Sequence, residues 1–200
     1  MAPIKTPTYD PKYNEPGPFT KFPGEGLPEI KRYITTHDAN GEGVFLPSDS
    51  GDHHALMGNG RGVYSIIYTT KEAQIDLNDD ADLKFAKEPP GLHVPNGTLV
   101  RMIDFAPGIE SPIHRAMSLD YGTVIEGELE VELDSGEKRI MRRGDVLVNR
   151  NALHTWRNTS PDKCARALFI LLDIAPMKPI GGKEIKLELG ELSHDYAEDH

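Results

Sequence analysis

The sequence is poor in cysteine and has no long apolar run. Its single cysteine, Cys164, allows no disulfide within the chain, which favours a reducing compartment. Cys164 precedes the apolar run 167–172, so we expect a buried thiol with a structural role. No apolar segment approaches the roughly 20 residues needed to cross a bilayer. Residues 1–7 lack the apolar core of a secretory signal. These absences together predict a cytoplasmic protein.

Basic clusters are also absent. No run of five basic residues occurs, and 22 Lys and Arg residues stand against 32 Asp and Glu residues, which gives a net charge of -10. An acidic protein repels phosphate backbones and anionic lipid surfaces. We therefore expect neither a nucleic acid nor a membrane as a partner.

The length and the proline distribution predict one domain with extended ends. Two hundred residues suffice for a single sizeable core. Residues 1–28 contain seven of the 16 prolines and little apolar periodicity, which predicts an extended arm. The domain is expected over residues 29–176 and to begin with an added hairpin between residues 30 and 46. Residues 177–200 predict a polar, mobile tail.

Short strands at turn-marked intervals follow in the second half of the chain. Residues 128–133 alternate glutamate with leucine or valine, which predicts a half-buried strand. A loop with Gly136 leads into a return strand at 138–141, and Gly144 precedes another at 146–148. This spacing indicates an all-β sandwich or barrel and not a parallel sheet.

Two histidines stand out against this pattern. His114 and His154 lie forty residues apart, and each follows a turn signal and enters a strand-like run. Side chains two residues apart share a face of a strand, so Ala116 lies beside His114 and Trp156 beside His154. If the intervening strands are antiparallel, both imidazoles face one interior.

These residues resemble the cupins, a family of small jelly-roll barrels. The first cupin motif has a glycine, two histidines, a glutamate and a glycine, and the chain has at these positions Gly108, His114, Ala116, Asp120 and Gly127. The second motif is matched at Gly144, His154 and Asn158, with Arg150 and Ala152 in place of a proline and a glycine. The resemblance covers about residues 98–173. The chain is similar to a subgroup of single-domain cupins, some of which accompany fungal secondary-metabolite pathways.

The resemblance implies a candidate metal site. The four ligands of the family are reduced here to His114, Asp120 and His154, because Ala116 replaces the second histidine. Asp120 is expected just past a bend, at the position from which the family directs a carboxylate to the metal. Two histidines and one carboxylate suit iron, zinc or manganese. Aspartate is shorter than glutamate, so a metal-bound and a metal-free site both remain open.

Without a metal, the same three residues predict an acid–base site. It would suit dehydration, isomerisation, cyclisation or decarboxylation of an activated carbonyl compound. Met117, Tyr121 and Trp156 are expected to line the substrate pocket, with ordinary core packing as the alternative. Arg101 would hold a substrate carboxylate if it points inward, and a solvent-facing or ion-paired position is the alternative.

We therefore expect a cupin jelly-roll barrel with an extended N-terminal arm and added N-terminal strands. Its expected function is that of a small-molecule enzyme, either a lyase or isomerase or a metal-dependent oxidoreductase, acting on a carbonyl-bearing or polyketide-like metabolite. A barrel that binds a small molecule without catalysis is the alternative. The proline-rich arm and the habit of the family predict a homodimer.

Overall fold

The computed structural model describes residue 19, residues 21–57, residue 60 and residues 62–194. In this part of the chain the strands are β1 (Thr35–His37), β2 (Gly43–Phe45), β3 (His53–Met57), β4 (Gly62–Lys71), β5 (Gly97–Phe105), β6 (Ser118–Glu126), β7 (Glu128–Leu133), β8 (Lys138–Arg142), β9 (Val146–Arg150), β10 (His154–Asn158) and β11 (Ala165–Asp173). The helical segments are η2 (Asn78–Asp80), α1 (Ala81–Ala86) and η3 (Gly190–His194).

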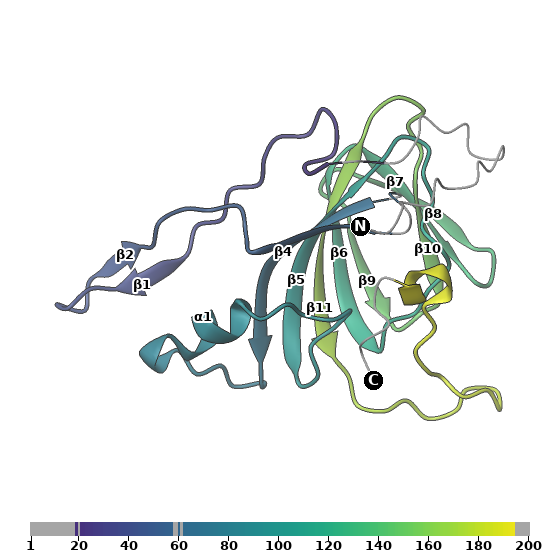
Figure 1. Ribbon diagram of the computed structural model, residues 1–200. Helices are drawn as coiled ribbons and strands as arrows, with labels where there is room; N and C mark the ends of the chain where they lie inside the picture. The colour runs from purple at the N-terminus through teal and green to yellow at the C-terminus, as the bar shows by residue number, and fades with distance from the viewer. Residues whose placement is uncertain (1–18, 20, 58–59, 61, 195–200) are drawn as a thin grey trace.

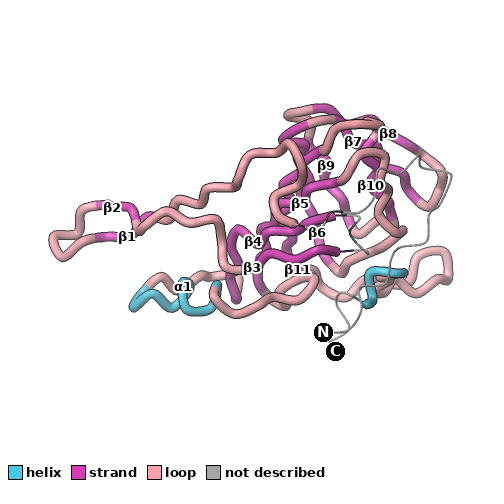
Figure 2. The backbone as a smooth tube through the Cα atoms, turned by 45° about the horizontal axis from the view of Figure 1, so that its top comes forward, coloured by secondary structure: helices cyan, strands magenta, loops and turns pink. Residues whose placement is uncertain are grey.

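Two antiparallel sheets enclose one interior (Figures 1 and 2). The larger sheet has the strand order β3-β4-β5-β11-β6-β9, and the smaller one has the order β10-β7-β8. Hairpin β1–β2 forms a separate two-stranded sheet that extends away from the barrel (Figure 1). The arrangement confirms the predicted all-β jelly roll with strands added before it.

Alternating apolar side chains place the core between the sheets. In β7, Leu129 and Val131 are buried, as the alternation with glutamate predicts. Val131 pairs with Trp156 in β10, whose ring packs edge-on against Phe169 at 5.2 Å between centroids. Gly122 pairs with Phe169 in the neighbouring strand, and a Cβ there would lie 3.2 Å from the indole. A glycine at this position therefore leaves room for the two rings.

A buried ion pair attaches the N-terminal segment to the barrel. Arg166 donates from Nε and Nη2 to Asp104 at 2.6 and 2.9 Å, and both residues are at most 4% exposed. Asp104 also accepts a hydrogen bond from the Gly24 N–H at 2.8 Å, and Arg166 donates to the Pro28 carbonyl at 2.8 Å. Residues 24–28 therefore lie against the barrel of their own chain, whereas residues 1–18 of the predicted arm lie outside the described residues.

Hairpin β1–β2 carries exposed apolar side chains. Tyr33, just before it, and Phe45 are 64% and 72% exposed, and their rings pack edge-on with centroids 6.4 Å apart. Val44 beside them is 38% exposed. Exposed apolar patches of this kind mark contact surfaces for other proteins. The homodimer stays a prediction.

The C-terminal segment, predicted as a polar and mobile tail, places one of its leucines in the core. Its described part ends in η3, where Leu192 is 2% exposed. Leu189 packs against the same core. The leucines in residues 186–192 alternate with charged residues and glycine, so the segment shows little hydrophobicity although it supplies a core residue.

Helical structure contributes little to the fold. Helix α1 has six residues and buries only Ala86. Within the described residues, no helix has the length and the apolar character that a membrane span requires.

Replacing Asp104 with alanine should destabilise the fold strongly. The substitution leaves the buried Arg166 guanidinium without its carboxylate, so the free energy of unfolding should fall by about 3–5 kcal/mol. Urea denaturation followed by the fluorescence of Trp156 measures the change. Asp134→Ala, at an exposed loop position, is the control and should leave stability within about 0.5 kcal/mol of the unmodified protein. Equal effects of the two substitutions would contradict a stabilising role for the ion pair.

The exposed hairpin gives a test of the predicted dimer. If a second copy covers Phe45, Phe45→Glu should convert the dimer into a monomer, because a desolvated carboxylate without a partner is unfavourable in an interface. Light scattering on the unmodified and substituted proteins measures both masses. A monomeric mass of the unmodified protein would disprove the dimer.

Candidate active site

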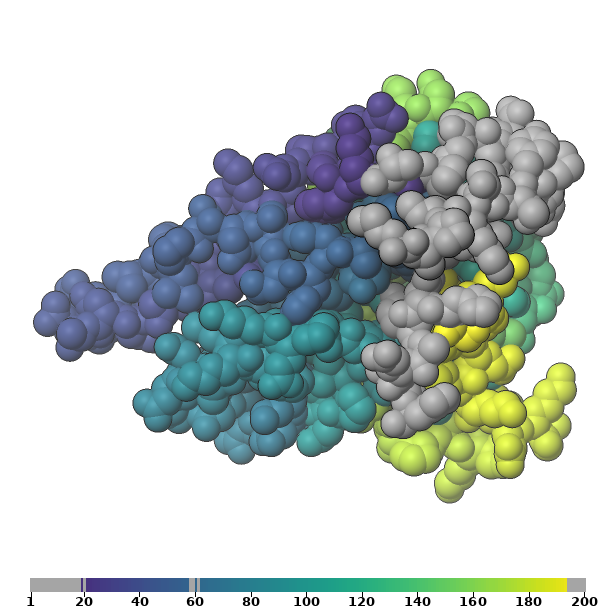
Figure 3. Space-filling model, in the orientation of Figure 1, coloured from purple at the N-terminus to yellow at the C-terminus, as the bar shows by residue number. Residues whose placement is uncertain are grey.

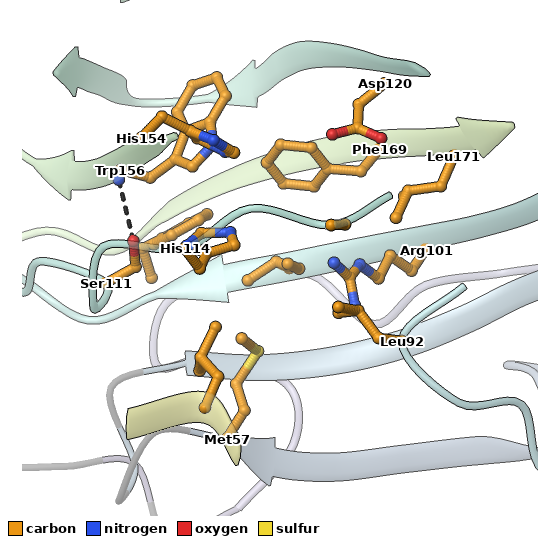
Figure 4. Close-up of a pocket in the computed structure, with 14 residues that line it drawn as sticks. Met57, Leu92, Arg101, Ser111, His114, Asp120, His154, Trp156, Phe169 and Leu171 are labelled. Carbon is orange, nitrogen blue, oxygen red and sulfur yellow. Dashed lines mark hydrogen bonds between the residues drawn. The ribbon is translucent and has the colours of Figure 1, made fainter. Parts of the chain in front are cut away.

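The interior of the barrel contains a narrow cavity of about 40 Å³, enough for about three water molecules. Most of its lining is apolar, including Trp156, Phe169 and Leu171 on one side (Figure 4). The polar side chains that line it are Arg101, Ser111, His114, Asp120 and His154. A few convergent polar groups in an apolar cavity are typical of a small-molecule site.

The two histidines meet as the sequence predicted. His114 and His154 form an antiparallel backbone bridge, in which each N–H donates to the carbonyl of the other at 3.0 Å. Their ring centroids are 4.5 Å apart, and both rings line the cavity (Figure 4). The backbone of the barrel therefore fixes the spacing of the imidazoles.

Backbone carbonyls define the protonation of both rings. His114 Nδ1 lies 2.8 Å from the Pro112 carbonyl, and His154 Nδ1 lies 2.9 Å from the Ala152 carbonyl. Asn149 Nδ2, a donor, lies 3.3 Å from His154 Nδ1, farther than the Ala152 carbonyl. Because a carbonyl only accepts, we assign the proton of each neutral ring to Nδ1 and leave Nε2 unprotonated. Two neutral imidazoles of this kind can accept protons or hydrogen bonds.

Burial keeps these histidines neutral. Desolvation, with smaller contributions from His154 and Arg101, lowers the pKa of His114 to about 3. Desolvation also lowers the pKa of His154, although the Asp120 carboxylate acts in the opposite direction. Both rings are therefore neutral at neutral pH.

Asp120 lies in strand β6, and not past a bend as predicted, and it is 9% exposed. Its Oδ2 accepts a hydrogen bond from Asn149 Nδ2 at 3.2 Å, while its buried Oδ1 has no hydrogen-bond partner. The amide of Asn149 is oriented by the Ala152 N–H, which donates to its Oδ1 at 2.9 Å. Burial raises the pKa of Asp120. Asn149, which sequence reasoning missed, therefore positions the carboxyl group between β6 and β9.

Arg101 points into the cavity, which is the inward of the two orientations considered from the sequence (Figure 4). It is 6% exposed, and its positive charge opposes protonation of both histidines. Asp104, three residues further along β5, faces the opposite side and pairs with Arg166. The strand therefore separates the two charges, and the cation is the one that reaches the cavity.

Two of the four predicted pocket residues lie elsewhere. Trp156 lines the cavity together with Arg101, but Tyr121 points outward from β6 and is 37% exposed. Tyr121 follows the inward-facing Asp120, and neighbouring residues of a strand face opposite sides. Met117 is also outside the lining, with its Sδ 3.8 Å from Asn151 Nδ2.

Apolar residues from distant segments take their place. Phe169 and Leu171 come from β11, Met57 from β3 and Leu192 from η3. The alternation of residues 169–171 along a strand indicates that Phe169 and Leu171 share a face. Nothing in the sequence linked Met57 or Leu192 to the site.

The predicted metal ligand set is not assembled. Within the described part of the chain, no three His, Cys, Asp or Glu side chains are grouped so as to hold a metal ion. His114 and His154 are adjacent, but the Asp120 carboxyl group is held by Asn149, and Ala116 stands where a further ligand would be needed. The residues present therefore do not fit a centre of two histidines and one carboxylate.

The fold and the paired histidines define a cupin, and sequence comparison agrees. The family model of the cupin domain matches residues 101–171. Proteins that are similar to this chain over most of its length are named for a cupin domain. This protein therefore belongs to the cupin family.

Several of these relatives come from filamentous fungi. The cupin-domain-containing oxidoreductase srdB of Neurospora crassa is 53% identical over 91% of this chain and 92% of its own. The cupin-domain-containing oxidoreductase virC of Hypocrea virens is 51% identical over 80% of this chain and 84% of its own. The oryzines biosynthesis cluster protein J of Aspergillus oryzae is 39% identical over 86% of this chain and 98% of its own.

The buried histidines should make stability depend on pH. The unfolded chain binds a proton at each histidine below pH about 6.5, whereas the folded His114 does so only near pH 3, so folding is disfavoured as the pH falls through this range. At pH 5 the loss from His114 should be about 2 kcal/mol. His114→Gln should remove this part of the difference between unfolding at pH 7 and at pH 5. Urea denaturation of both proteins at the two pH values measures it.

His37→Gln, on the exposed hairpin, is the matched control and should keep the full pH dependence. The buried neutral state of His114 would be ruled out if His114→Gln and His37→Gln lost equal stability on acidification.

Proposed function

We propose that this protein is an enzyme of secondary metabolism that removes a proton from the carbon next to the carbonyl of a small metabolite. For a net oxidation, a diffusible oxidised nicotinamide or flavin then takes a hydride from the adjacent carbon, which leaves an α,β-unsaturated carbonyl compound. The observation that carries the proposal is the meeting of one buried cation and two neutral imidazoles in a single apolar cavity. Arg101 provides the cation, and His114 and His154 provide the bases. Groups of this kind bind a developing oxyanion and accept the proton that is lost.

In the proposed reaction, the Arg101 guanidinium donates hydrogen bonds to the substrate carbonyl oxygen. The apolar walls exclude water, so the attraction between this cation and the developing negative charge is stronger than it would be in solvent. The substrate carbonyl is therefore the group most directly activated by the protein.

His154 is the proposed base. Its unprotonated Nε2 takes the proton from the carbon next to the carbonyl, and the nearby Asp120 carboxylate stabilises the imidazolium that results. His114 Nε2 accepts a hydrogen bond from a substrate hydroxyl and orients the ring or chain that carries it. Asn149 keeps Asp120 in place during this transfer.

The names of the relatives support a net oxidation or reduction. Two of those described above are named oxidoreductases, and a third is named for a biosynthesis cluster. The acid–base character of the pocket favours a second candidate, a lyase or isomerase, because proton removal beside a carbonyl also begins dehydration and isomerisation. A carrier that binds the metabolite without reaction is the non-enzymatic alternative.

Metabolite comparison tests these possibilities. A producing strain that lacks the protein should accumulate a carbonyl compound, and the purified protein, supplied with an oxidised nicotinamide or flavin, should convert it. A product that differs by two hydrogen atoms indicates an oxidoreductase, an unchanged mass an isomerase, and the loss of water or carbon dioxide a lyase. Binding without conversion would overturn the enzymatic proposal.

Substitution of the pocket residues should then separate their roles. His154→Asn should lower kcat by about 10²–10⁴-fold, because it removes the proposed base. Arg101→Gln should lower kcat/KM by about 10²–10³-fold, because it removes the group that holds the oxyanion. Steady-state kinetics on the accumulated compound measures both effects. Tyr121→Phe, on the outer face of β6, should retain normal rates. Unchanged kcat in His154→Asn would reject His154 as the base.

A further inference from the structure

The end of the described chain contributes a side chain to the wall of the cavity. Leu192 is 2% exposed and lines the cavity together with Met57. It also lines a second small apolar cavity beside Ser111 and Pro112. The backbone of the C-terminal segment, coloured yellow, lies on the outside of the barrel (Figures 1 and 3). A side chain from a surface segment therefore forms part of the wall of an internal site.

We infer that residues 187–194 are a gate over the candidate active site and that Leu192 controls access to it. The inference rests on the proposed function only in taking this cavity as the place where a ligand binds. The cavity of about 40 Å³ is far smaller than the 300–1,000 Å³ or so of typical ligand pockets, so part of the wall must move before an organic molecule enters. The question is which wall moves.

Hydrogen bonding identifies the C-terminal segment as the movable wall. Most other residues of the wall lie on strands of the two sheets, such as Arg101 in β5 and Phe169 in β11, which are bonded along eight residue pairs. Among the described residues, the backbone of residues 187–194 pairs with the barrel only at the isolated bridge between Glu188 and Arg115. Segments with few backbone hydrogen bonds to their surroundings open at lower free energy than central strands.

The bridge connects the gate directly to the segment that carries His114. Arg115 N–H donates to the Glu188 carbonyl at 2.6 Å, and Glu188 N–H donates to the Arg115 carbonyl at 3.0 Å. Arg115 Nη1 also donates to Glu188 Oε1 at 2.8 Å, and the Glu188 side chain is 44% exposed. Arg115 lies between His114 and Ala116, both of which line the cavity. Opening of the gate therefore breaks contacts next to His114.

Gly190 sets how closely η3 approaches the barrel. Its φ is +55°, in the left-handed region, and a Cβ at this position would lie 2.9 Å from the Ile113 carbonyl oxygen. A residue with a side chain at this position would push the start of η3 away from the segment of residues 113–116, which carries His114. Gly190→Ala therefore lifts the gate without changing Leu192.

The single tryptophan of the chain provides the test. Trp156 is 3% exposed and lines the cavity, so the quenching of its fluorescence by acrylamide reports entry of a small molecule. Leu192→Ala in the full-length protein should raise the quenching constant at least about threefold, since it removes the side chain that forms this part of the wall. Leu187→Ala is the matched control, because Leu187 lies in the same segment but is 37% exposed, and it should quench like the unmodified protein.

Gly190→Ala is the second variant, and it should raise quenching while Leu192 is retained. Circular dichroism establishes that each variant is folded. A folded Leu192→Ala or Gly190→Ala protein with the quenching constant of the unmodified protein would overturn the gate.

Hydrogen exchange on the unmodified protein tests the same inference if a variant fails to fold. The amides of Arg115 and Glu188, which form the bridge, should exchange at least about tenfold faster than the Val124 amide within β6. Equal protection would show a fixed wall and would reject the gate. Neither measurement requires turnover, so failure of the gate is distinct from failure of the proposed enzyme.

Discussion

The candidate site depends on one short backbone pairing. His114 and His154 exchange two hydrogen bonds of 3.0 Å, and this pairing brings together two stretches of chain that are forty residues apart. Backbone bonds fix Cα positions, and the carbonyls of Pro112 and Ala152 then orient each ring. The imidazoles are consequently placed by the main chain and not by contacts with each other. Such preorganisation suits chemistry that needs two bases at constant spacing.

The cavity combines the cationic side chain of Arg101 with two neutral histidines and with Asp120, whose pKa is raised. Burial lowers the pKa of both histidines and raises the pKa of Asp120, and the positive charge of Arg101 lowers the pKa of both histidines further. A substrate that develops negative charge gains most from this arrangement, and so the electrostatics of the cavity and the proposed reaction agree.

Sequence patterns predicted the barrel and the histidine pair because both depend on period-two alternation. Leu129 and Val131 are buried as expected, and His114 and His154 share one interior. The same rule, applied to Tyr121, would have placed it outside once Asp120 was placed inside, and the expected bend before Asp120 hid this. Other features depend on partners distant in sequence. The pairing of Asp104 with Arg166 and the use of Leu192 as a core residue have no local signal that a pattern can detect.

Alternation along residues 114–116 also explains why access and chemistry can be coupled. His114 and Ala116 point into the cavity, whereas Arg115 points out and joins Glu188. Ala116, in place of a larger side chain, and Leu192 both contribute to the wall of the cavity. A segment of three residues positions a base, places a small side chain beside it and attaches the gate. Movement of the C-terminal segment must therefore be felt at His114, because the same backbone carries both contacts.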